Sequence, residues 1–521
     1  MDGSDRSTRL SPVVAAAARP DPSRSVSPAD DGSRRPSAST VILEMLSPTH
    51  APELLRTINL FSNFSFAFTS MNVLSSVSIL YSFGLRNGGP AVIVWGWLVG
   101  ATLSTITGLC LAEICSVFPQ AGGVYQWAGQ LAPPEYAPFW TYATSWMIFL
   151  GNTACAASYA YGFANVIAAA YHVYSNTSLS TNVQAVIAIG TGLVWGAISS
   201  LHLPKQSLLH NFATVFQMTS TIGIIVAISS RGPSKQSAEF VFGATHDGTG
   251  FNSIWYAGVI GILMSVFGFS GYDSGTHLAE ETLDASVTAP RGIVATCLST
   301  GVVGLAYLVG LLYSTDSIDA ALATPNAAVY VFTLTLGSTG GFVLALLLAA
   351  NLFFGGASAI TCSSRIAFAM ARDQALPSML AKVNPVTNVP LMAVWFVSLC
   401  VCTLQLLVVG STVAFMAITS ISNVGFQLAY AFPIVLRLYT FNANRFQQGG
   451  FSLGRWALPC CVLAALWLMA TTVICFLPQA SPATPDNLNY SIVVVGGICL
   501  LGVAYWQLHA KTAYHKPDRP N

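Results

Sequence analysis

Charge is scarce in this chain: Asp, Glu, Lys and Arg make up only 8% of its 521 residues, whereas hydrophobic residues make up 53%. Soluble domains carry roughly a quarter charged residues, so this scarcity excludes an ordinary cytosolic protein. The mean hydropathy is positive. Apolar runs of about 20 residues, each long enough to cross a hydrocarbon core of about 30 Å, recur from Phe61 to His509. The sequence therefore predicts a polytopic membrane protein, with the lipid bilayer as a partner.

Motifs of enzyme chemistry are missing as well. The sequence contains no CxxC pair, phosphate-binding glycine loop, nucleophile–base set or cluster of metal-ligating residues. Its eleven cysteines lie in or beside apolar runs, where Cys usually acts as a small buried apolar residue. We therefore expect no enzymatic activity, no metal, no cofactor and no nucleic-acid partner.

The two ends of the chain differ from its middle. The stretch "PDPSRSVSPADDGSRRPSAS" is rich in Ser, Pro, Arg and Asp and has no apolar period, which predicts a disordered tail over residues 1–55. No apolar segment follows its basic residues, so it is not a signal peptide. We expect residues 56–510 to form one transmembrane domain and residues 511–521 a second, short tail.

Hydropathy, with Gly, Pro and charge clusters as boundaries, predicts twelve transmembrane helices. The third and eighth exceed the length that a bilayer needs, so we expect them to be tilted. The predicted spans are 60–85, 90–116, 137–171, 183–202, 207–229, 254–281, 291–314, 339–371, 391–409, 411–437, 457–477 and 490–510.

Basic residues predict the orientation. If both tails are cytosolic, only Arg86, Arg231 and Lys235 of the 21 Lys and Arg residues face outward. Cytosolic loops of membrane proteins carry an excess of Lys and Arg, so this bias favours a cytosolic position for both tails. We expect the plasma membrane as the location, with an internal membrane as the alternative.

The sixth predicted span contains "FGFSGYDSGTHLAEET" at Phe267–Thr282. Each of its three glycines weakens a helix by about 1 kcal/mol relative to Ala. A broken helix is tolerated in lipid only where the break is buried or lines a polar cavity. Interrupted helices at matching positions of two halves indicate a transporter's binding site. The alternative is that the glycines serve close helix packing.

The matching position is the middle of the first span, "NFSFAFTSMNVLSS", which is polar but has no glycine or proline. Two short segments therefore form the predicted substrate site. Its residues are Thr69, Ser70, Met71 and Asn72 in the first span, and Phe269, Ser270, Gly271, Tyr272 and Asp273 in the sixth.

Charged residues in and near the sixth span have two interpretations each. Asp273 either caps the inner half-helix or titrates or binds a substrate amine. His277 either relays protons or is structural. An inner gate is predicted where charged residues end spans six and eight, and ordinary interfacial charge is the alternative. The predicted gate residues are Glu280, Glu281, Arg365 and Arg372.

Three motifs carry a resemblance to a known family: "GLCLAEICSVFPQAGGVYQWAGQLAP" (Gly108–Pro133), "GYDSGTHLAEETLDASVTAPRGI" (Gly271–Ile293) and "SSRIAFAMARDQALP" (Ser363–Pro377). The chain resembles the amino acid–polyamine–organocation superfamily. Within it, the match is to the amino acid/choline branch of GABA permeases and plant-type bidirectional amino acid transporters. "FSLGRW" at Phe451 and "LNYS" at Leu488 resemble the plant-like group too.

The resemblance implies an all-α fold with a five-plus-five inverted repeat, broken first and sixth helices, and two additional helices. It also implies that backbone groups exposed at the breaks hold the substrate's carboxylate and amine, which carries over to Ser270 and Gly271. Many relatives have a glycine-rich first break, where this chain reads "TSMN" at Thr69–Asn72. Some proton-coupled relatives use a lysine in span five, and "SLLHNFATVFQMTSTIG" (Ser207–Gly223) has none.

The predicted function is therefore a secondary transporter that moves an amino acid or a GABA-like zwitterion by alternating access. Exchange, facilitated movement or coupling to an ion remain open. One alternative is a nutrient sensor on a transporter fold. Another is a choline or polyamine carrier, for which Asp273, Tyr272 and Trp255 supply pieces of a cation site.

Overall fold

The computed structural model describes residues 58–510, with gaps at 121, 231–234, 409–412, 442–445, 447–448 and 485–487. The described residues lie in one unit, His50–Arg519. Both predicted tails, 1–55 and 511–521, fall outside the described residues. Below, "inner" marks the end of the domain that the Lys and Arg residues predict to be cytosolic, and "outer" the opposite end.

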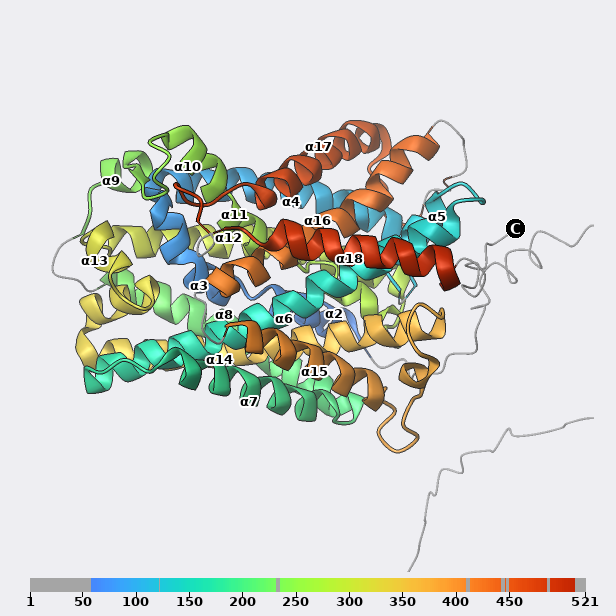
Figure 1. The fold of residues 1–521 in the computed structure, drawn as a ribbon, viewed down its shortest axis with the longest axis horizontal. Helices are drawn as coiled ribbons and strands as arrows, with labels where there is room; N and C mark the ends of the chain where they lie inside the picture. Colours follow the sequence, from blue (N-terminus) through green and yellow to red (C-terminus); the bar gives the residue numbers. More distant parts are fainter. Residues whose placement is uncertain are drawn as a thin grey trace, which may run out of the picture. The chain divides into compact units, whose positions relative to one another are not determined.

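The described chain is almost entirely helical, and the predicted all-α polytopic membrane fold is confirmed (Figure 1). Helices in spans one to five are α2 (Leu60–Met71), α3 (Val73–Arg86), α4 (Gly89–Val117), α6 (Ala137–Ser175), α7 (Thr181–Ser199) and α8 (Leu203–Ser230). Span six contains α10 (Ile254–Gly261), α11 (Leu263–Gly268) and the 3₁₀-helix η1 (Ser274–Glu281). Spans seven to twelve contain α12 (Ala285–Tyr313), α14 (Ala327–Arg372), α15 (Leu391–Val408), α16 (Val413–Thr440), α17 (Ala457–Phe476) and α18 (Ser491–Tyr505).

Short elements join these spans. At the inner end lie α5 (Val124–Leu131), η2 (Ser378–Ala381) and η4 (Gly454–Trp456), and η5 (Trp506–Ala510) continues α18. At the outer end lie α9 (Ala238–Gly243) and α13 (Ile318–Leu322), and β1 (Asn87–Gly88) pairs with β2 (His246–Asp247) as an antiparallel ladder. In Figure 1, α9 and α13 lie to the left and α5 to the right.

Hydropathy located the spans well. Nine helices of the described residues are long and apolar enough to cross a membrane, and Ile254–Gly268 and Leu391–Leu406 are shorter apolar helices. The third span, α6, has 39 residues. The long α14 is divided at Gly337, whose φ of 71° and ψ of 177° are not helical. The eighth span therefore begins just after Gly337, close to the predicted start at residue 339.

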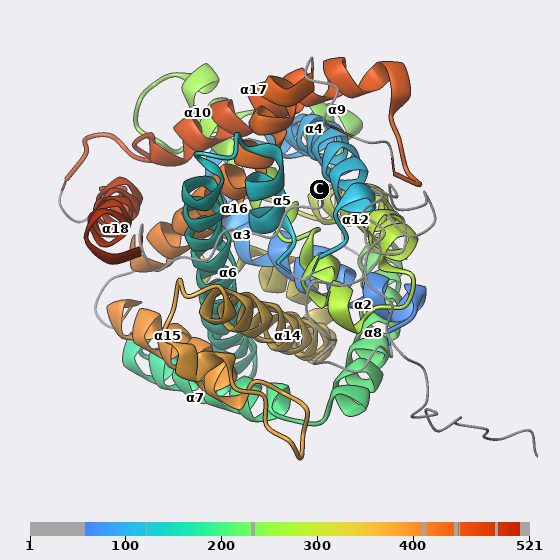
Figure 2. The same cartoon turned by 90° about the vertical axis from the view of Figure 1, so that its right-hand side faces the viewer.

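Packing follows the predicted inverted repeat. Span two (α4) packs on span seven (α12), span three (α6) on span eight (α14), and span four (α7) on span nine (α15). In these three pairs, a helix contacts the helix at the matching position of the other half, which is consistent with a twofold relation between the halves. Figure 2 shows α6 and α14 side by side in the interior, with α18 at the edge.

Large apolar side chains are exposed on the outward faces of the peripheral helices. Val302 of α12 is 71% exposed and Leu500 of α18 is 74% exposed. Such side chains are costly in water but suit lipid chains, whereas the backbone polar groups of these helices are bonded internally. The exposed faces are therefore lipid-facing surface.

Both predicted breaks are present. In span one, Asn72 separates α2 from α3 with a left-handed backbone, φ 42° and ψ 69°. Asn is one of the few residues that adopts this conformation readily, so a break forms there without glycine. In span six, residues 269–273 form turns between α11 and η1, and Gly271 has φ 89°. The inner half of span six is a 3₁₀-helix rather than the expected α-helix.

The break at Asn72 predicts a stability difference between two asparagines. Asn72 is fully buried, and its side-chain amide donates a hydrogen bond to the Asn351 carbonyl oxygen. Asn176, at the end of α6, has a similar left-handed backbone (φ 54°) but is exposed. Asn72→Ala should therefore lose about 1–3 kcal/mol more than Asn176→Ala, because it also loses two buried side-chain hydrogen bonds, to the Asn351 carbonyl oxygen and from the Ser75 N–H.

Thermal unfolding of the purified protein in detergent measures this difference. We expect the midpoint to fall in the order wild type, Asn176→Ala, Asn72→Ala, with Asn72→Gly between the last two because Gly accepts the left-handed backbone. Equal midpoints for the two alanine variants would contradict the role of Asn72.

Candidate substrate-binding site

The two breaks lie against each other. The Ser274 hydroxyl, at the start of η1, donates a hydrogen bond of 3.1 Å to the Ser70 hydroxyl near the end of α2. A Cβ atom added to Gly271 would lie 3.7 Å from the same Ser70 oxygen. The predicted halves of the site, residues 69–72 and 269–273, are therefore brought together, and all of them are buried.

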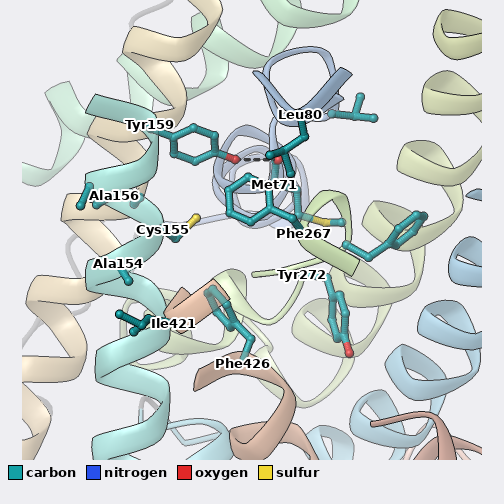
Figure 3. Packing of buried hydrophobic residues seen from close by; sticks show 14 of the residues in the cluster. Met71, Leu80, Ala154, Cys155, Ala156, Tyr159, Phe267, Tyr272, Ile421 and Phe426 are labelled. Atoms are coloured by element: carbon teal, nitrogen blue, oxygen red, sulfur yellow. Dashed lines mark hydrogen bonds between the residues drawn. The ribbon is translucent and has the colours of Figure 1, made fainter. Parts of the chain in front are cut away.

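Tyr159 of α6 satisfies the carbonyl groups that the first break frees. Its hydroxyl lies 2.8 Å from the Ser70 carbonyl oxygen and 2.7 Å from that of Met71. The Ser76 hydroxyl donates a second bond, of 2.7 Å, to the Met71 carbonyl. Figure 3 shows Tyr159 reaching from α6 to Met71. Sequence reasoning did not select Tyr159.

The other two predicted residues of the first break are tied to neighbouring helices. The Thr69 and Thr214 hydroxyls lie 2.9 Å apart, which joins α2 to α8. The Asn72 amide bonds to Asn351 of α14. These two side chains hold the break in place, so they contribute to the shape of the site through packing.

Residues of span ten complete the sixth break. The Ser270 hydroxyl donates to the Val266 carbonyl oxygen (3.1 Å) and to Oδ1 of Asn423 (3.4 Å). The Gly271 N–H donates to the Tyr430 hydroxyl (3.2 Å). The Tyr272 ring stacks on the Tyr430 ring, with centroids 4.8 Å apart. Asn423 and Tyr430 are both on α16, and neither was selected from the sequence.

The remaining aromatic residue of the sixth break is Phe269. Its ring packs against Trp97 of α4, with ring centroids 5.2 Å apart. In Figure 3, Phe267, Tyr272 and Phe426 belong to one apolar cluster with Met71 of the first break. The site is therefore lined by aromatic rings and by a small number of hydroxyl and backbone groups.

Asp273 does not cap the inner half of span six. It stands at the N-cap position of η1, but its side chain makes no capping hydrogen bond. Instead, its Oδ1 accepts a bond of 2.5 Å from the Tyr430 hydroxyl, and its Oδ2 lies 3.0 Å from Nε2 of His277. The capping interpretation is wrong, because the carboxylate turns towards these two side chains rather than towards the free N–H groups of η1.

The three glycines of the sixth span have different surroundings. A Cβ atom at Gly268 would lie 2.8 Å from the Trp97 ring, and one at Gly275 would lie 2.6 Å from Oδ1 of Asn63. Both glycines therefore allow close helix packing. A Cβ at Gly271 would meet nothing nearer than 3.5 Å. Gly271 is required by its positive φ of 89°, which L side chains adopt rarely.

At the inner end, Glu281 of η1 pairs with Arg365 of α14. Arg365 Nε lies 3.2 Å from Glu281 Oε1, and the two side chains are 3% and 1% exposed. The Arg365 guanidinium also donates to Oε1 of Gln206, on α8, at 3.5 Å. Two of the four predicted gate residues are thus in direct contact.

The other two predicted gate residues lie close by in the chain. The Glu280 backbone belongs to η1, and its side chain falls outside the described residues. Arg372 ends α14, two helical turns beyond Arg365, and its guanidinium lies 5.9 Å from the centroid of the Phe368 ring.

Further bonds close the inner end between spans one and six. The Ile58 N–H donates to the Glu281 carbonyl oxygen (2.9 Å), and the Leu283 N–H donates to the Ile58 carbonyl oxygen (2.8 Å). The buried Asn63 amide donates to the Gly275 carbonyl oxygen at 2.8 Å. The inner halves of the two broken spans are therefore fastened along their length.

A hollow lies on the outer side of the breaks. It has a volume of about 10 Å³, close to the lower limit for holding one water molecule. Its lining residues are Leu80, Phe83, Leu263, Met416, Thr419, Ser420, Asn423 and Gln479. Asn423 accepts the hydrogen bond from Ser270, so one of the lining residues of the hollow also contacts the sixth break.

An inverted repeat of spanning helices, two facing breaks and a charged inner closure define a secondary transporter fold. The sequence pattern of the family described as "Amino acid permease" matches residues 58–498. The chain belongs to the amino acid permease family, which confirms the resemblance drawn from its motifs. It is accordingly an integral, multi-pass membrane protein that transports amino acids, and not an enzyme.

Several named proteins are similar over nearly their whole length. Amino-acid permease BAT1 of Arabidopsis thaliana is 33% identical over 485 residues, covering 89% of this chain and 94% of that protein. The BAT1 homolog of Oryza sativa subsp. japonica is 34% identical, covering 89% and 93%. The thiamine transporter thi9 of Schizosaccharomyces pombe is 28% identical over 495 residues, covering 87% and 83%.

The buried Glu281–Arg365 pair predicts how the inner closure responds when one partner is removed. Removing one partner of a buried ion pair costs about 3–5 kcal/mol, because the other charge remains buried. Glu281→Gln should therefore favour an open inner end, where water reaches Arg365. The Glu281→Gln/Arg365→Met double variant should regain closure in part, since no buried charge is left unpaired.

The native thiol of Cys362 reports on this opening. It is fully buried, and its sulfur lies 3.9 Å from the Ser274 carbonyl oxygen. Modification by N-ethylmaleimide, followed by peptide mass spectrometry, should be faster at Cys362 in Glu281→Gln than in wild type. The buried Cys475, near the outer end of α17, is the internal control. An unchanged rate at Cys362 would rule out a gate at this pair.

Proposed function

We propose that the protein carries amino acids or GABA by alternating access, with the substrate held where the two breaks meet. The observation that carries the proposal is the contact between Ser70 and Ser274 across two interrupted helices. Helix N-termini favour anions and helix C-termini favour cations. The N-terminus of α3 would hold the substrate's carboxylate, and the carbonyl ends of α2 and α11 its amine.

The described conformation fits one stage of such a cycle. The inner side is closed by the Glu281–Arg365 pair and by the bonds of Ile58 and Asn63. The outer side retains the hollow that Asn423 helps to line. We propose that substrate enters past Asn423 and leaves when the inner bonds separate. Both tails on the cytosolic side and the plasma membrane as location are part of this proposal.

The surroundings of Asp273 favour a zwitterion over a choline-like cation. Both carboxylate oxygens of Asp273 already have partners, Tyr430 and His277. Trp255, a candidate for an aromatic box, is 86% exposed at the outer end of span six. An aromatic cage for a quaternary ammonium needs several rings around one cation, and Trp255 does not face the buried site.

Uptake into proteoliposomes tests the proposal. The panel consists of labelled amino acids, GABA, choline, thiamine and a polyamine, with thiamine included because of its named transporter among the relatives. We expect saturable uptake of amino acids or GABA that choline and thiamine do not inhibit. Uptake of cations alone would establish the alternative carrier function. Substrate binding without uptake or exchange would indicate a sensor.

Two glycine variants test the position of the site. Gly271→Leu should abolish uptake, because the side chain would fill the space beside Ser70, Ser274 and Phe426 and would strain a backbone of positive φ by about 1–3 kcal/mol. Gly268→Ala is the matched control. Its Cβ would press on Trp97, which should lower stability by about 1–3 kcal/mol but leave substrate binding intact.

Thermal unfolding with and without substrate separates the two effects. Gly268→Ala should unfold at a lower temperature and still be stabilised by substrate. Gly271→Leu should lose the stabilisation by substrate while remaining folded. If Gly271→Leu is stabilised by substrate as wild type is, then the junction of the two breaks is not the binding site.

A further inference from the structure

Asp273, His277 and Tyr430 form a buried cluster beside the junction of the two breaks. Their exposed fractions are 0%, 2% and 2%. Tyr430 donates a hydrogen bond of 2.5 Å to one oxygen of Asp273, and His277 Nε2 lies 3.0 Å from the other. The proposed contacts to the substrate's carboxylate and amine do not involve these three side chains.

A proton determines the net charge of this cluster. A buried carboxylate without a compensating charge is strongly disfavoured. Arg365 lies further along towards the inner end and is engaged by Glu281. The partner of Asp273 is His277, whose charge depends on its protonation. With Asp273 ionised and His277 neutral, the cluster carries one negative charge. One added proton makes the cluster neutral.

Other titratable groups face Asp273 from each packed helix, and they are mostly thiols and phenols, which are ordinarily uncharged near neutral pH. These groups are Cys115 of α4, Cys297 of α12, Cys362 of α14 and Tyr430 of α16, with Tyr272 beside Asp273 in the chain. The Glu281–Arg365 pair at the end of η1 is internally compensated. The proton shared by Asp273 and His277 therefore controls the charge at this position.

The cluster is connected to the proposed substrate site by a chain of hydrogen bonds. The Gly271 N–H donates to the Tyr430 hydroxyl, and that hydroxyl donates to Asp273. A ligand that accepts from Gly271 must replace Tyr430 as the acceptor. The charge of Asp273 and the occupancy of the site therefore affect each other through one tyrosine.

His277 gives the proton a route from the cluster towards the inner end. Its Nδ1 is buried and has no hydrogen-bond partner among the described residues. A Cβ atom added to Gly123, just before α5, would lie 3.2 Å from this nitrogen. Nδ1 thus faces the loop between α4 and α5, where a proton can be passed to water when the inner end opens.

We propose that Asp273 and His277 form a proton-binding site that couples amino acid uptake to an inward proton gradient. Tyr430 links this site to the substrate site through its hydrogen bonds to Asp273 and Gly271. The inference rests on the proposed transport function. One proton is taken from outside water and released to the cytosol in each cycle, and no other bond changes. Substrate and proton move together because the substrate's carboxylate, bound at the same junction, is favoured beside a neutral cluster and repelled by a negative one.

Asp273→Asn removes the charge of the cluster and keeps both hydrogen bonds. The amide oxygen can still accept from Tyr430, and the amide nitrogen can still donate to His277 Nε2. His277→Gln removes the second titratable group. His210→Gln is the matched control, because His210 is equally buried, at 2% exposed, but lies on α8 against Phe66.

The experiment compares accumulation with exchange in proteoliposomes whose membrane potential is clamped. For wild type and His210→Gln, a gradient of one pH unit, alkaline inside, should raise amino acid accumulation up to about tenfold. In Asp273→Asn and His277→Gln, exchange of internal for external amino acid should be slower but measurable, and the accumulation should be lost. Infrared difference spectra between about pH 5 and pH 8 should show a carboxyl band that Asp273→Asn lacks.

The outcomes separate this inference from the function on which it rests. Two outcomes would overturn the proton site without contradicting the transport function. In one, amino acid uptake by wild type does not depend on the pH gradient. In the other, Asp273→Asn and His277→Gln still accumulate amino acid. Failure of wild type to move any amino acid overturns the transport function. Infrared spectra that are identical for wild type and Asp273→Asn overturn the proton site in either case.

Discussion

The backbone groups freed at the two helix breaks must find partners inside the protein, because lipid offers none. Much of the architecture answers this requirement. Tyr159 of α6 bonds to the Ser70 and Met71 carbonyls of the first break, and Tyr430 of α16 accepts from the Gly271 N–H of the second. Spans three and ten are therefore tied to the breaks by tyrosine hydroxyls, whose rings suit the apolar surroundings.

The same requirement explains why the substrate site is so small in the described conformation. Carbonyl and amide groups that a substrate would use are engaged by side chains of the protein itself. Binding must then exchange one set of hydrogen bonds for another of similar strength. Affinity and specificity would come from differences between these sets, and the protein remains stable in the absence of substrate.

The sequence predicted features that depend on local chemistry and missed features that depend on distant partners. Gly271 could be selected because a cluster of glycines in a membrane helix is unusual, and Asn72 because the first span is polar at the matching depth. Tyr159 and Tyr430 could not, since a tyrosine in an apolar helix gives no sign of which break it will reach. For Asp273, the position after a turn left a cap and a titrating or amine-binding role both open, because the groups that decide its contacts are a hydroxyl on α16 and a histidine one turn away.

At the inner gate, too, the sequence predicted the local feature and missed the distant partner. Arg365 and Arg372 lie two turns apart on one helix, so the sequence places both on the same face and does not distinguish their depth. The structure does, because Glu281 at the end of η1 is buried together with Arg365. The fold was the most predictable level, since hydropathy and basic residues report directly on the bilayer.

The 3₁₀-helix η1 is joined to span one along its length. The inner half of span six contacts span one at both ends, from Ser274 beside Ser70 to Glu281 beside Ile58. The Asn63 amide also donates to the Gly275 carbonyl oxygen and to the Thr282 hydroxyl. Because 3₁₀ hydrogen bonds are weaker than α-helical ones, η1 depends on Asn63 and Arg365 to hold it closed, and it is the part of the inner closure that can separate with the least disruption of the helices around it.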